Sequence, residues 1–412
     1  MPVSLSVMHT FSITDLSPDQ TRSETFLGGS VRVISHSGLH PTEGQLIEQL
    51  SHLPAPPASL LVAGNRTGAV ALAANASYPG CAVTCHVFDI HHARAVLRNL
   101  SANGAGPVFL HDAFVAVPCD LPEAALTETA KRPFAPRVAC TAQIPEGNYA
   151  AALFMATPGT MTGELVLDQI EDIHRHLVVG GVCVIACEAE SGPLIKQIRT
   201  LFGNVSIISD KRGIFCAKAL KTDQAARMRD FSATFPASLT NKETLSLCSL
   251  PGVFCHRRPD TGGLALAEVA ARELRQGQRV LDMGCGCGLV GILLARAQPD
   301  VCVTFIDSHA RAMEATRRNL ASLGLENHTL LLSDTGTERT GFDLFAGNPP
   351  YYSDFKIATL FIDTARSALR PGGRCMLVAK STRRLEETLR GRFDNVEVLS
   401  RRGYGVVQSV VR

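Results

Sequence analysis

Three absences narrow the classes to which this chain can belong. No apolar run approaches the ~20 residues that a membrane-spanning helix needs, and the first residues lack a basic segment followed by a long apolar block. We therefore expect neither a membrane protein nor a secreted one. The triphosphate-binding motif GxxxxGK[ST] is also missing, which removes the lysine that such sites use.

The cysteines are numerous but do not form the usual paired motifs. None of the 13 stands in a CxxC pair. Reduced, mostly buried thiols in a cytoplasmic protein are a better interpretation than a disulfide or metal framework. The close histidine pairs lack an evident third ligand, so we expect no metal site.

Length and charge indicate two domains of different character. At 412 residues the chain is long for a single core, and its 45% hydrophobic and 19% charged residues are ordinary for a soluble globular protein. The net charge of +2 is uneven, because the residues from Lys221 onward carry +6 and those before it −4. The C-terminal half is therefore the half that we expect to meet a polyanion.

The sequence contains the same pattern twice. Residues 59–104 and 279–324 each give a β-branched strand, a glycine loop, a helix, a proline turn, a second strand that ends in Asp, and a helix with the letters HARA and RNL. Residues 152–188 and 343–380 continue the match. A repeat of this length indicates two copies of one domain rather than a solenoid.

Strands that alternate with helices predict an α/β fold, with a mostly parallel sheet covered on both faces in each copy. We expect a first domain over 1–220 and a second over 221–412, with the polar segment 221–243 as the linker or lead-in. A helix is predicted over 356–370, ended by the Arg-Pro-Gly-Gly that begins at Arg370. In the second copy the predicted strands are 279–283, 302–306, 329–333, 342–347, 374–380, 394–399 and 404–411.

The glycine loop of the second copy predicts a nucleotide site. Gly284, Gly286 and Gly288 lie between a strand and a helix, where glycines let the backbone approach a ligand at the carboxyl edge of the sheet. Asp307 ends the next strand, in position to accept hydrogen bonds from ribose hydroxyls, and Asp334 follows the third strand, within reach of an adenine edge. The alternative is that both aspartates are solvated strand-end caps.

The chemistry of this loop narrows the choice of nucleotide. A dinucleotide site favours GxGxxG, whereas this loop reads GxGxG. Asp282 in the first strand would repel a pyrophosphate but suits a cationic amino-acid ligand. S-adenosylmethionine, which carries sulfonium and ammonium charges, satisfies both observations.

The stretch Asn348-Pro349-Pro350-Tyr351 follows the fourth predicted strand, beside that site. If the Asn348 side-chain oxygen and the Pro349 carbonyl each accept an N–H of an exocyclic purine amine, the nitrogen can pyramidalise and aim its lone pair at a sulfonium methyl. The prolines hold φ fixed, and the Tyr351 ring offers a surface on which a flipped base can stack. The alternative is a proline turn that only ends a strand, with Tyr351 in the core.

Together these motifs resemble those of a known family. LPGVFCHRRPDTGG (250–263), VLDMGCGCG, FID, SDTGT and NPPY are similar to class I S-adenosylmethionine-dependent methyltransferases, specifically to the small-domain methyltransferases of ribosomal RNA guanine N2. The two-copy layout resembles the bacterial RsmC/RlmG type, in which a degenerate methyltransferase domain precedes an active one. The resemblance implies two tandem Rossmann-like domains with seven-stranded sheets, and methylation of the N2 amine of a guanosine. It also implies ribosomal RNA or a ribosomal subunit as the partner of a cytoplasmic protein, without membrane or metal, that we expect to be a monomer.

The resemblance also assigns the site residues. The segment that matches Phe254 to Gly263 is implied to line the cofactor pocket, and the Asn-Pro-Pro-Tyr is implied to act on the guanine amine. Tyr351 stands where many such enzymes have Phe. The expected cofactor-binding residues are Phe254, Asp260, Gly262, Asp282, Gly284, Cys285, Gly286, Gly288, Asp307, Ser308, Asp334, Thr335 and Asn348. The expected catalytic residues are Asn348, Pro349, Pro350 and Tyr351.

The first copy departs from this pattern at the same positions. Arg66 stands in place of the middle glycine, where it would crowd a cofactor, and Ala63 or Val62 replaces the strand aspartate. Thr157-Pro158-Gly159-Thr160 replaces Asn-Pro-Pro-Tyr, and Asp89 alone is expected to bind nothing. We predict that this copy neither binds cofactor nor catalyses, and that it braces the second domain or helps to hold RNA.

Three other functions stay open at this point. Release-factor methyltransferases, which act on a protein glutamine, also use Asn-Pro-Pro-Tyr, but they carry a small helical domain in front. Adenine N6 methylation of nucleic acid would use the same amine chemistry, although no separate target-reading domain is visible. A non-enzymatic RNA-binding scaffold fits the first copy but not the intact second one. Candidate phosphate contacts, with a charged helix face as the alternative, are Arg383, Arg384, Arg390 and Arg392.

Overall fold

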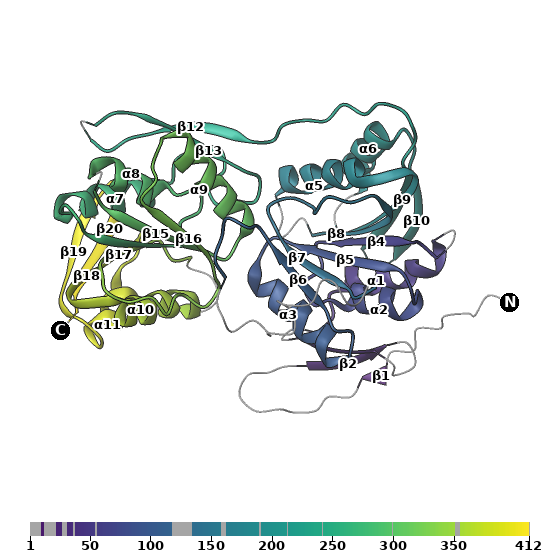
Figure 1. Ribbon diagram of the computed structural model, residues 1–412, viewed down its shortest axis with the longest axis horizontal. Helices are drawn as coiled ribbons and strands as arrows, with labels where there is room; N and C mark the ends of the chain where they lie inside the picture. The colour runs from purple at the N-terminus through teal and green to yellow at the C-terminus, as the bar shows by residue number, and fades with distance from the viewer. Residues whose placement is uncertain are drawn as a thin grey trace. The chain divides into compact units, whose positions relative to one another are not determined.

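The computed structural model describes residues 10–11, 22–26, 31–35, 38–53, 56–117, 134–157, 162–188, 191–211, 213–240, 242–298, 300–350 and 355–411. The chain divides into two compact units, each with its own sheet between helices (Figure 1). The first unit comprises Met1–Asp112 and Asp120–Phe231, and the second comprises Ala113–Cys119 and Ser232–Arg412.

The polar segment 221–243 is split between the two units. Its first part lies with the first unit, where the Arg229 backbone N–H donates to Glu171 Oε2 at 2.7 Å and the Arg229 side chain pairs with the same carboxylate. Its second part contains β12 (Ala233–Ala237), which pairs antiparallel with β13 (Leu245–Ser249). The segment is therefore more ordered than its polar composition indicates.

The sheet of the second unit has seven strands within the described residues, in the order β16-β15-β14-β17-β18-β20-β19. The first five pair in parallel, and β20 runs antiparallel between β18 and β19. Helices α7, α8 and α9 cover one face, and α10 and α11 cover the other (Figure 1). The strands are β14 (Arg279–Met283), β15 (Cys302–Asp307), β16 (His328–Leu332), β17 (Phe342–Gly347), β18 (Leu369–Ala379), β19 (Asp394–Arg401) and β20 (Tyr404–Val410). The helices are α7 (Thr261–Glu273), α8 (Leu289–Ala297), α9 (Ala310–Ser322), α10 (Lys356–Ala368) and α11 (Arg383–Arg390).

All seven predicted strands of the second copy are present, and one of them starts five residues earlier than predicted. Strand β18 begins at Leu369 rather than at residue 374, because Arg-Pro-Gly-Gly forms an irregular stretch of the strand instead of a helix end. Gly373 lies close to β17, since a Cβ on it would be 3.0 Å from the Phe342 carbonyl oxygen. The strand order reverses between β14 and β17, and in sheets of this kind ligands bind at the carboxyl ends of the strands beside such a reversal.

The first unit repeats this architecture with one additional strand. Its main sheet, counted over the described residues, has eight strands in the order β10-β11-β9-β8-β4-β5-β7-β6, where seven were predicted. A small sheet, β1-β2-β3, precedes it. The strands are β1 (Thr10–Phe11), β2 (Arg22–Phe26), β3 (Val31–Ser35), β4 (Ser59–Ala63), β5 (Ala82–Val87), β6 (Val108–His111), β7 (Arg137–Cys140), β8 (Tyr149–Ala156), β9 (Leu177–Cys187), β10 (Ser206–Lys211) and β11 (Ile214–Leu220). The helices are α1 (Pro41–Gln49), the 3₁₀ turn η2 (Leu50–His52), α2 (Ala69–Ser77), α3 (Ile90–Ala102), α5 (Gly163–His176) and α6 (Ser191–Phe202).

The additional strand is β7, which pairs in parallel with both β5 and β6. It takes the place beside β5 that β16 takes beside β15 in the second unit, and so moves β6 to the edge. The sequence repeat did not reveal it, because β7 is short and has no counterpart in the second copy.

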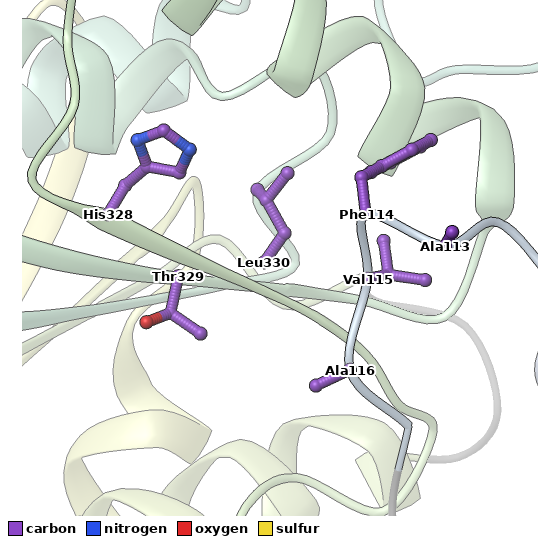
Figure 2. A pocket seen from close by; sticks show the side chains of 7 residues that line it. All are labelled: Ala113, Phe114, Val115, Ala116, His328, Thr329 and Leu330. Atoms are coloured by element: carbon purple, nitrogen blue, oxygen red, sulfur yellow. The ribbon is translucent and has the colours of Figure 1, made fainter.

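The edge of the second sheet is covered by a segment from between β6 and β7. Ala116 forms a parallel bridge with Leu331: its N–H donates to Leu330 O at 3.0 Å, and its carbonyl accepts from Leu332 N at 2.9 Å. Figure 2 shows residues 113–116 running beside His328, Thr329 and Leu330, with which they line a shallow groove. Parallel edge strands expose unpaired backbone groups, so this bridge protects part of β16.

From the sequence we expected neither a membrane-spanning helix nor a metal site. Within the described ranges, no helix is both long and apolar enough to cross a membrane. The described residues also contain no group of three or more His, Cys, Asp or Glu side chains that could hold a metal ion.

Candidate active site

The loop between β14 and α8 requires glycine for two separate reasons. Gly284 and Gly288 have φ angles of 70° and 83°, in the left-handed region. A Cβ on Gly284 would lie 2.9 Å from the Phe361 ring, and a Cβ on Gly288 would lie 2.7 Å from Ile292 Cδ1. Any other residue would therefore strain the backbone and overlap a neighbour. The loop predicted from the sequence is present, with its conformation fixed by packing beneath it.

Asp307 connects this loop to the next strand. It is the last residue of β15, and its Oδ2 accepts from Gly286 N at 2.9 Å while its Oδ1 accepts from His309 N at 3.0 Å. The side chain is half-buried. The carboxylate is thus held at the strand end beside the glycine loop, where the predicted ribose contact requires it. That contact itself stays a prediction.

The two cysteines of the loop are buried, neutral thiols. Cys285 and Cys287 are 6% and 5% exposed. Burial raises the pKa of Cys287 to about 12 and raises that of Cys285 well above its usual range. The Cys285 backbone N–H donates to Ile306 O at 3.0 Å, so this residue acts in the loop through its backbone.

Asp282 lies directly beneath the loop. It is 2% exposed, and its Oδ2 accepts from Gly291 N in α8 at 2.8 Å. Burial, with a further contribution from the Asp307 carboxylate, raises the pKa of Asp282 to about 7. A cation bound above the loop would favour the ionised form, which agrees with the predicted preference for a cationic ligand.

The most informative contact joins Asn348 to Asp260. Asn348 follows β17 directly, and its Nδ2 donates to Asp260 Oδ2 at 2.7 Å. Asp260 is the N-cap of α7, where its carboxylate also accepts from Gly262 N at 3.3 Å and Gly263 N at 2.6 Å. Because a carboxylate only accepts, the Asn348 amide must present its NH₂ to Asp260. Its Oδ1 then remains as the side-chain acceptor for a ligand.

The rest of the Asn-Pro-Pro-Tyr is only partly described. Pro349 is buried and Pro350 is half-buried. Tyr351 lies outside the described residues, so the predicted stacking surface stays a prediction. In the first copy, Pro158, Gly159 and Thr160 also lie outside the described residues.

The other predicted cofactor contacts surround this edge of the sheet. Ser308 follows Asp307 and is half-buried, as is Asp334, whereas Thr335 is exposed. Ser333, which follows β16, donates its backbone N–H to Asp307 O at 2.9 Å and thereby ties the Asp334 turn to β15. Gly262, the second residue of α7, packs against the ring of Tyr404, since a Cβ there would be 3.2 Å from Tyr404 Cε1. Phe254 is 70% exposed in the free chain, which makes it a large apolar side chain available to a ligand.

Sequence interpretation missed a clamp on α9 that holds the loop. Asn319 Nδ2 donates to Cys287 O at 2.9 Å and to Cys248 O at 2.8 Å, and its Oδ1 accepts from Cys248 N at 2.7 Å. On the same helix, Thr316 Oγ1 donates to Gly286 O at 3.0 Å. The sequence did contain an indication of this role, because Asn319 is the Asn of the letters RNL that both copies share.

The first copy has the same clamp. Asn99 Nδ2 donates to Thr67 O at 2.8 Å and to Ile34 O at 3.0 Å, and its Oδ1 accepts from Ile34 N at 2.9 Å. The repeated Asn therefore ties a glycine loop to a strand of an accessory sheet in both units. Its role is architectural, since it does not depend on the loop being able to bind a ligand.

A side chain of α1 is buried against the glycine loop of the first copy. Glu43 is fully buried; its Oε1 accepts from Thr67 Oγ1 at 2.7 Å and from Thr67 N at 3.3 Å, and burial raises its pKa. Glu43 is the third residue of α1, and the third residue of α7 is Gly263. The second copy therefore has a glycine where the first has a carboxylate chain against the loop.

The fold, the strand-end glycine loop and the oriented Asn-Pro-Pro are those of an α/β methyltransferase. Residues 244–408 match the family described as methyltransferase small domain. The ribosomal RNA small subunit methyltransferase C of Haemophilus influenzae is 32% identical over 223 residues, which cover 52% of this chain and 66% of that protein. The protein of the same name from Shewanella loihica is 30% identical over 233 residues, which cover 54% of this chain and 67% of that protein. The chain belongs to the family of the ribosomal RNA small subunit methyltransferases C, as its motifs indicated.

Comparison with solved structures concerns the fold. The T. thermophilus 16S rRNA N2 G1207 methyltransferase (RsmC), in complex with AdoMet and guanosine, matches with a TM-score of 0.70 at 21% identity. The match covers 97% of this chain and 98% of that one, so it spans both units. The predicted fold class, two tandem α/β domains of the methyltransferase type, is confirmed, with the eight-stranded first sheet as the one difference in strand number.

Proposed function

We propose that this protein transfers a methyl group from S-adenosylmethionine to the exocyclic N2 amine of a guanosine in small-subunit ribosomal RNA. The observation that carries the proposal is the Asn348–Asp260 hydrogen bond of 2.7 Å. It leaves an amide oxygen, next to Pro349, as an acceptor for an N–H, which is what an aromatic amine requires in order to become a nucleophile. The family relationship supports guanine over adenine.

The chain's own groups orient the amine. Asn348 Oδ1 accepts one N–H of guanine N2 and the Pro349 carbonyl accepts the other, so that the nitrogen lone pair points out of the base plane. S-adenosylmethionine supplies an electrophilic methyl on a sulfonium. Methyl transfer from that sulfonium would leave N2 positively charged until one of its protons leaves to solvent. Both acceptors stabilise that developing charge, so no strong base is needed.

The cofactor residues fit a cationic nucleoside. Asp307 would hold the ribose, and Asp334 and Thr335 would lie at the adenine edge. The Asp282 carboxyl, with a pKa of about 7 under the glycine loop, adds negative charge once a cation is present. Phe254 would cover the ligand from the side of the segment that precedes α7.

We assign catalysis to 221–412 and a non-catalytic role to 1–220. The buried Glu43 against Thr67 supports this division, because it places a carboxylate side chain against the first loop where the second copy has Gly263. The substrate is ribosomal RNA or an assembled small subunit, met in the cytoplasm by a monomer.

The test is methyl transfer from a radiolabelled donor to three substrates: protein-free small-subunit rRNA, assembled small subunits, and a release factor. We expect label in RNA that digests to N2-methylguanosine. Label recovered as N6-methyladenosine, or only in the release factor, would contradict the proposal.

A further inference from the structure

One aromatic side chain of α10 packs against both halves of the candidate active site. Phe361 is 5% exposed and belongs to the same core as Phe345 and Leu377. A Cβ on Gly284 would be 2.9 Å from Phe361 Cζ, and a Cβ on Gly347 would be 2.8 Å from Phe361 Cδ1. The same ring therefore lies against the turn that follows β14 and against the last residue of β17.

These two glycines stand where the two halves of the site leave the sheet. Gly284 is the first glycine of the cofactor loop, and its N–H donates to Ile306 O at 2.8 Å. Gly347 is followed directly by Asn348, which carries the proposed acceptor oxygen. Strands β14 and β17 pair in parallel with Met283 opposite Gly347, so the loop and the acceptor emerge side by side. The Phe361 ring lies at the position where the spacing between them is set.

Further contacts hold this ring in place. Thr364, one turn later on α10, is 6% exposed and packs against Gly336, which belongs to the turn that carries Asp334. Gly336 has a φ angle of 85° and leaves no room for a side chain against Thr364. Phe345 of β17 meets the Phe361 ring edge-on, with the ring centroids 6.4 Å apart. Because interiors are close-packed, the ring cannot retreat from the two glycines without displacing these neighbours.

We propose that Phe361 is a positioning residue, which sets the separation between the cofactor loop and the amide oxygen of Asn348. The inference rests on the proposed function, because it takes a methyl donor to lie on the loop and an amine to lie on Asn348. Reacting atoms must be aligned at about 3 to 3.5 Å, and a misplacement of 1 Å can cost about 100-fold in rate. Since Phe361 is buried on the core side of both glycines, its loss should change the rate more than the binding of either ligand.

The experiment compares Phe361→Leu with Phe393→Leu. Both phenylalanines belong to the same core, at 5% and 3% exposure, and both substitutions replace a buried ring by a smaller side chain. Within the described residues, Phe361 is the only side chain that a Cβ on Gly284 would meet within 4 Å, so Phe393 is the matched control. For each variant we would measure kcat and KM for methyl transfer to rRNA, calorimetric affinity for S-adenosylmethionine, and hydrogen exchange of the free chain.

In Phe361→Leu we expect kcat to fall by about 10- to 100-fold, while the KM for RNA and the affinity for S-adenosylmethionine change by less than about threefold. In the free chain, the peptides that contain Gly284 and Gly347 should both exchange faster, because the ring that packs against them is lost. Phe393→Leu should lower Tm to a similar extent but keep the wild-type kcat and the wild-type exchange at these two glycines.

Gly347→Ala provides a second check, because its methyl group would overlap Phe361 Cδ1. Alone it should reduce kcat. In the Phe361→Leu background the same substitution should cost less, so the two losses should not multiply. Losses that multiply would show that the ring and Gly347 act independently, against the proposal.

Equal kcat values for Phe361→Leu and Phe393→Leu would overturn the proposal, as would a defect confined to KM or to the affinity for S-adenosylmethionine. Wild-type exchange at both glycines in Phe361→Leu would also overturn it, whatever the substrate is. If the wild-type chain methylates a different amine, the proposed function fails, and kcat on that amine then decides the role of Phe361. The two failures are distinguishable because the ring acts on the geometry of the site and not on the identity of the base.

Discussion

A primary amide can present either an oxygen or an NH₂ to a ligand, and in Asn348 a neighbouring carboxylate makes the choice. Asp260 accepts from the Asn348 NH₂ and from two backbone amides of α7. The same side chain thus starts a helix and sets the orientation of the candidate catalytic group. An acceptor aimed in advance is more effective than one that must reorient during reaction.

Replacing Asp260 by Ala tests this orientation. Asp260 Oδ2 accepts from both Asn348 Nδ2 and Gly263 N, so Ala removes the group that holds the Asn348 NH₂ together with the N-cap of α7. The Asn348 amide can then present either its oxygen or its NH₂ to the substrate, and we expect kcat to fall by about 100-fold, the loss typical of one missing transition-state contact. The lost cap should lower the free energy of unfolding by about 1 kcal/mol, which leaves the chain folded at assay temperature. Full activity in Asp260→Ala would show that the amide orientation is not set by this pair.

The complementary variant, Asn348→Ala, removes the acceptor itself. We expect a decrease in methyl-transfer rate of about 100-fold or more, again by analogy with a lost oxyanion-type contact. Affinity for S-adenosylmethionine, measured by calorimetry, should change much less than the rate. Unchanged turnover would remove Asn348 from the mechanism.

Asp282 gives the site a pH dependence. Its pKa is about 7 in the free chain, and a bound cation favours the ionised form, so cofactor binding releases a proton at and below neutral pH. Affinity for S-adenosylmethionine should therefore rise with pH up to about 7, by at most about tenfold per unit, and then level off. The check is calorimetry at pH 6, 7 and 8 with Asp282→Asn alongside, which should bind more weakly and lose this dependence. The same slope in both proteins would assign the titration to another group.

At the residue scale, the sequence predicted which residues belong to the candidate site better than it predicted the contacts between them. The glycines, Asp307 and Asn348 could be found because strand-end position and residue type alone indicate their chemistry. The Asp260–Asn348 pair could not, because it joins residues that are far apart in the chain and depends on how α7 and β17 end beside each other. Asp260 was singled out only through the family resemblance.

At the scale of elements, α9 shows how a motif can be repeated for stability alone. Asn319 and Asn99 each bridge a glycine loop and a neighbouring strand through three hydrogen bonds. Both are buried, at 1% and 0% exposure, so removing either side chain would leave buried backbone groups without these partners. Each such group costs about 1 to 3 kcal/mol, which explains why both copies keep the Asn.

The bridge at Ala116 links an edge element to the cofactor site. Ala116 pairs with β16, and β16 leads into the turn of Asp334 and Thr335. Ala116→Pro removes the N–H that Leu330 accepts, so we expect faster hydrogen exchange at Leu332 and weaker binding of S-adenosylmethionine. Ala116→Gly, which keeps both hydrogen bonds, is the control. If Ala116→Pro behaved like Ala116→Gly, β16 would not depend on this segment.

At the scale of the whole molecule, the sequence shows that a domain is duplicated, but it does not show where the two copies differ in structure. Alternation of strands and helices predicted both sheets, because hydrophobic periodicity reflects local burial. It did not predict β7, or the excursion of residues 113–119 into the second unit, because strand partners at an edge are set by geometry far along the chain.

The loop of the first unit predicts the cofactor stoichiometry. Glu43 is buried against Thr67 at the position where the second unit has Gly263, and Arg66 replaces the middle glycine, so the first loop lacks the form that the second one has. Calorimetric titration of the full chain with S-adenosylmethionine should therefore give one site. Asp307→Ala should weaken that site, and Asp89→Ala should leave it unchanged. Two sites per chain would show that the first copy is not silent.

The excursion at 113–119 also bears on where this polypeptide can be cut. A gene fragment that starts at the apparent domain junction would encode every motif of the methyltransferase site and yet omit the piece that shields β16. Its open parallel edge would be available for pairing with another copy, so such fragments are candidates for aggregation during expression.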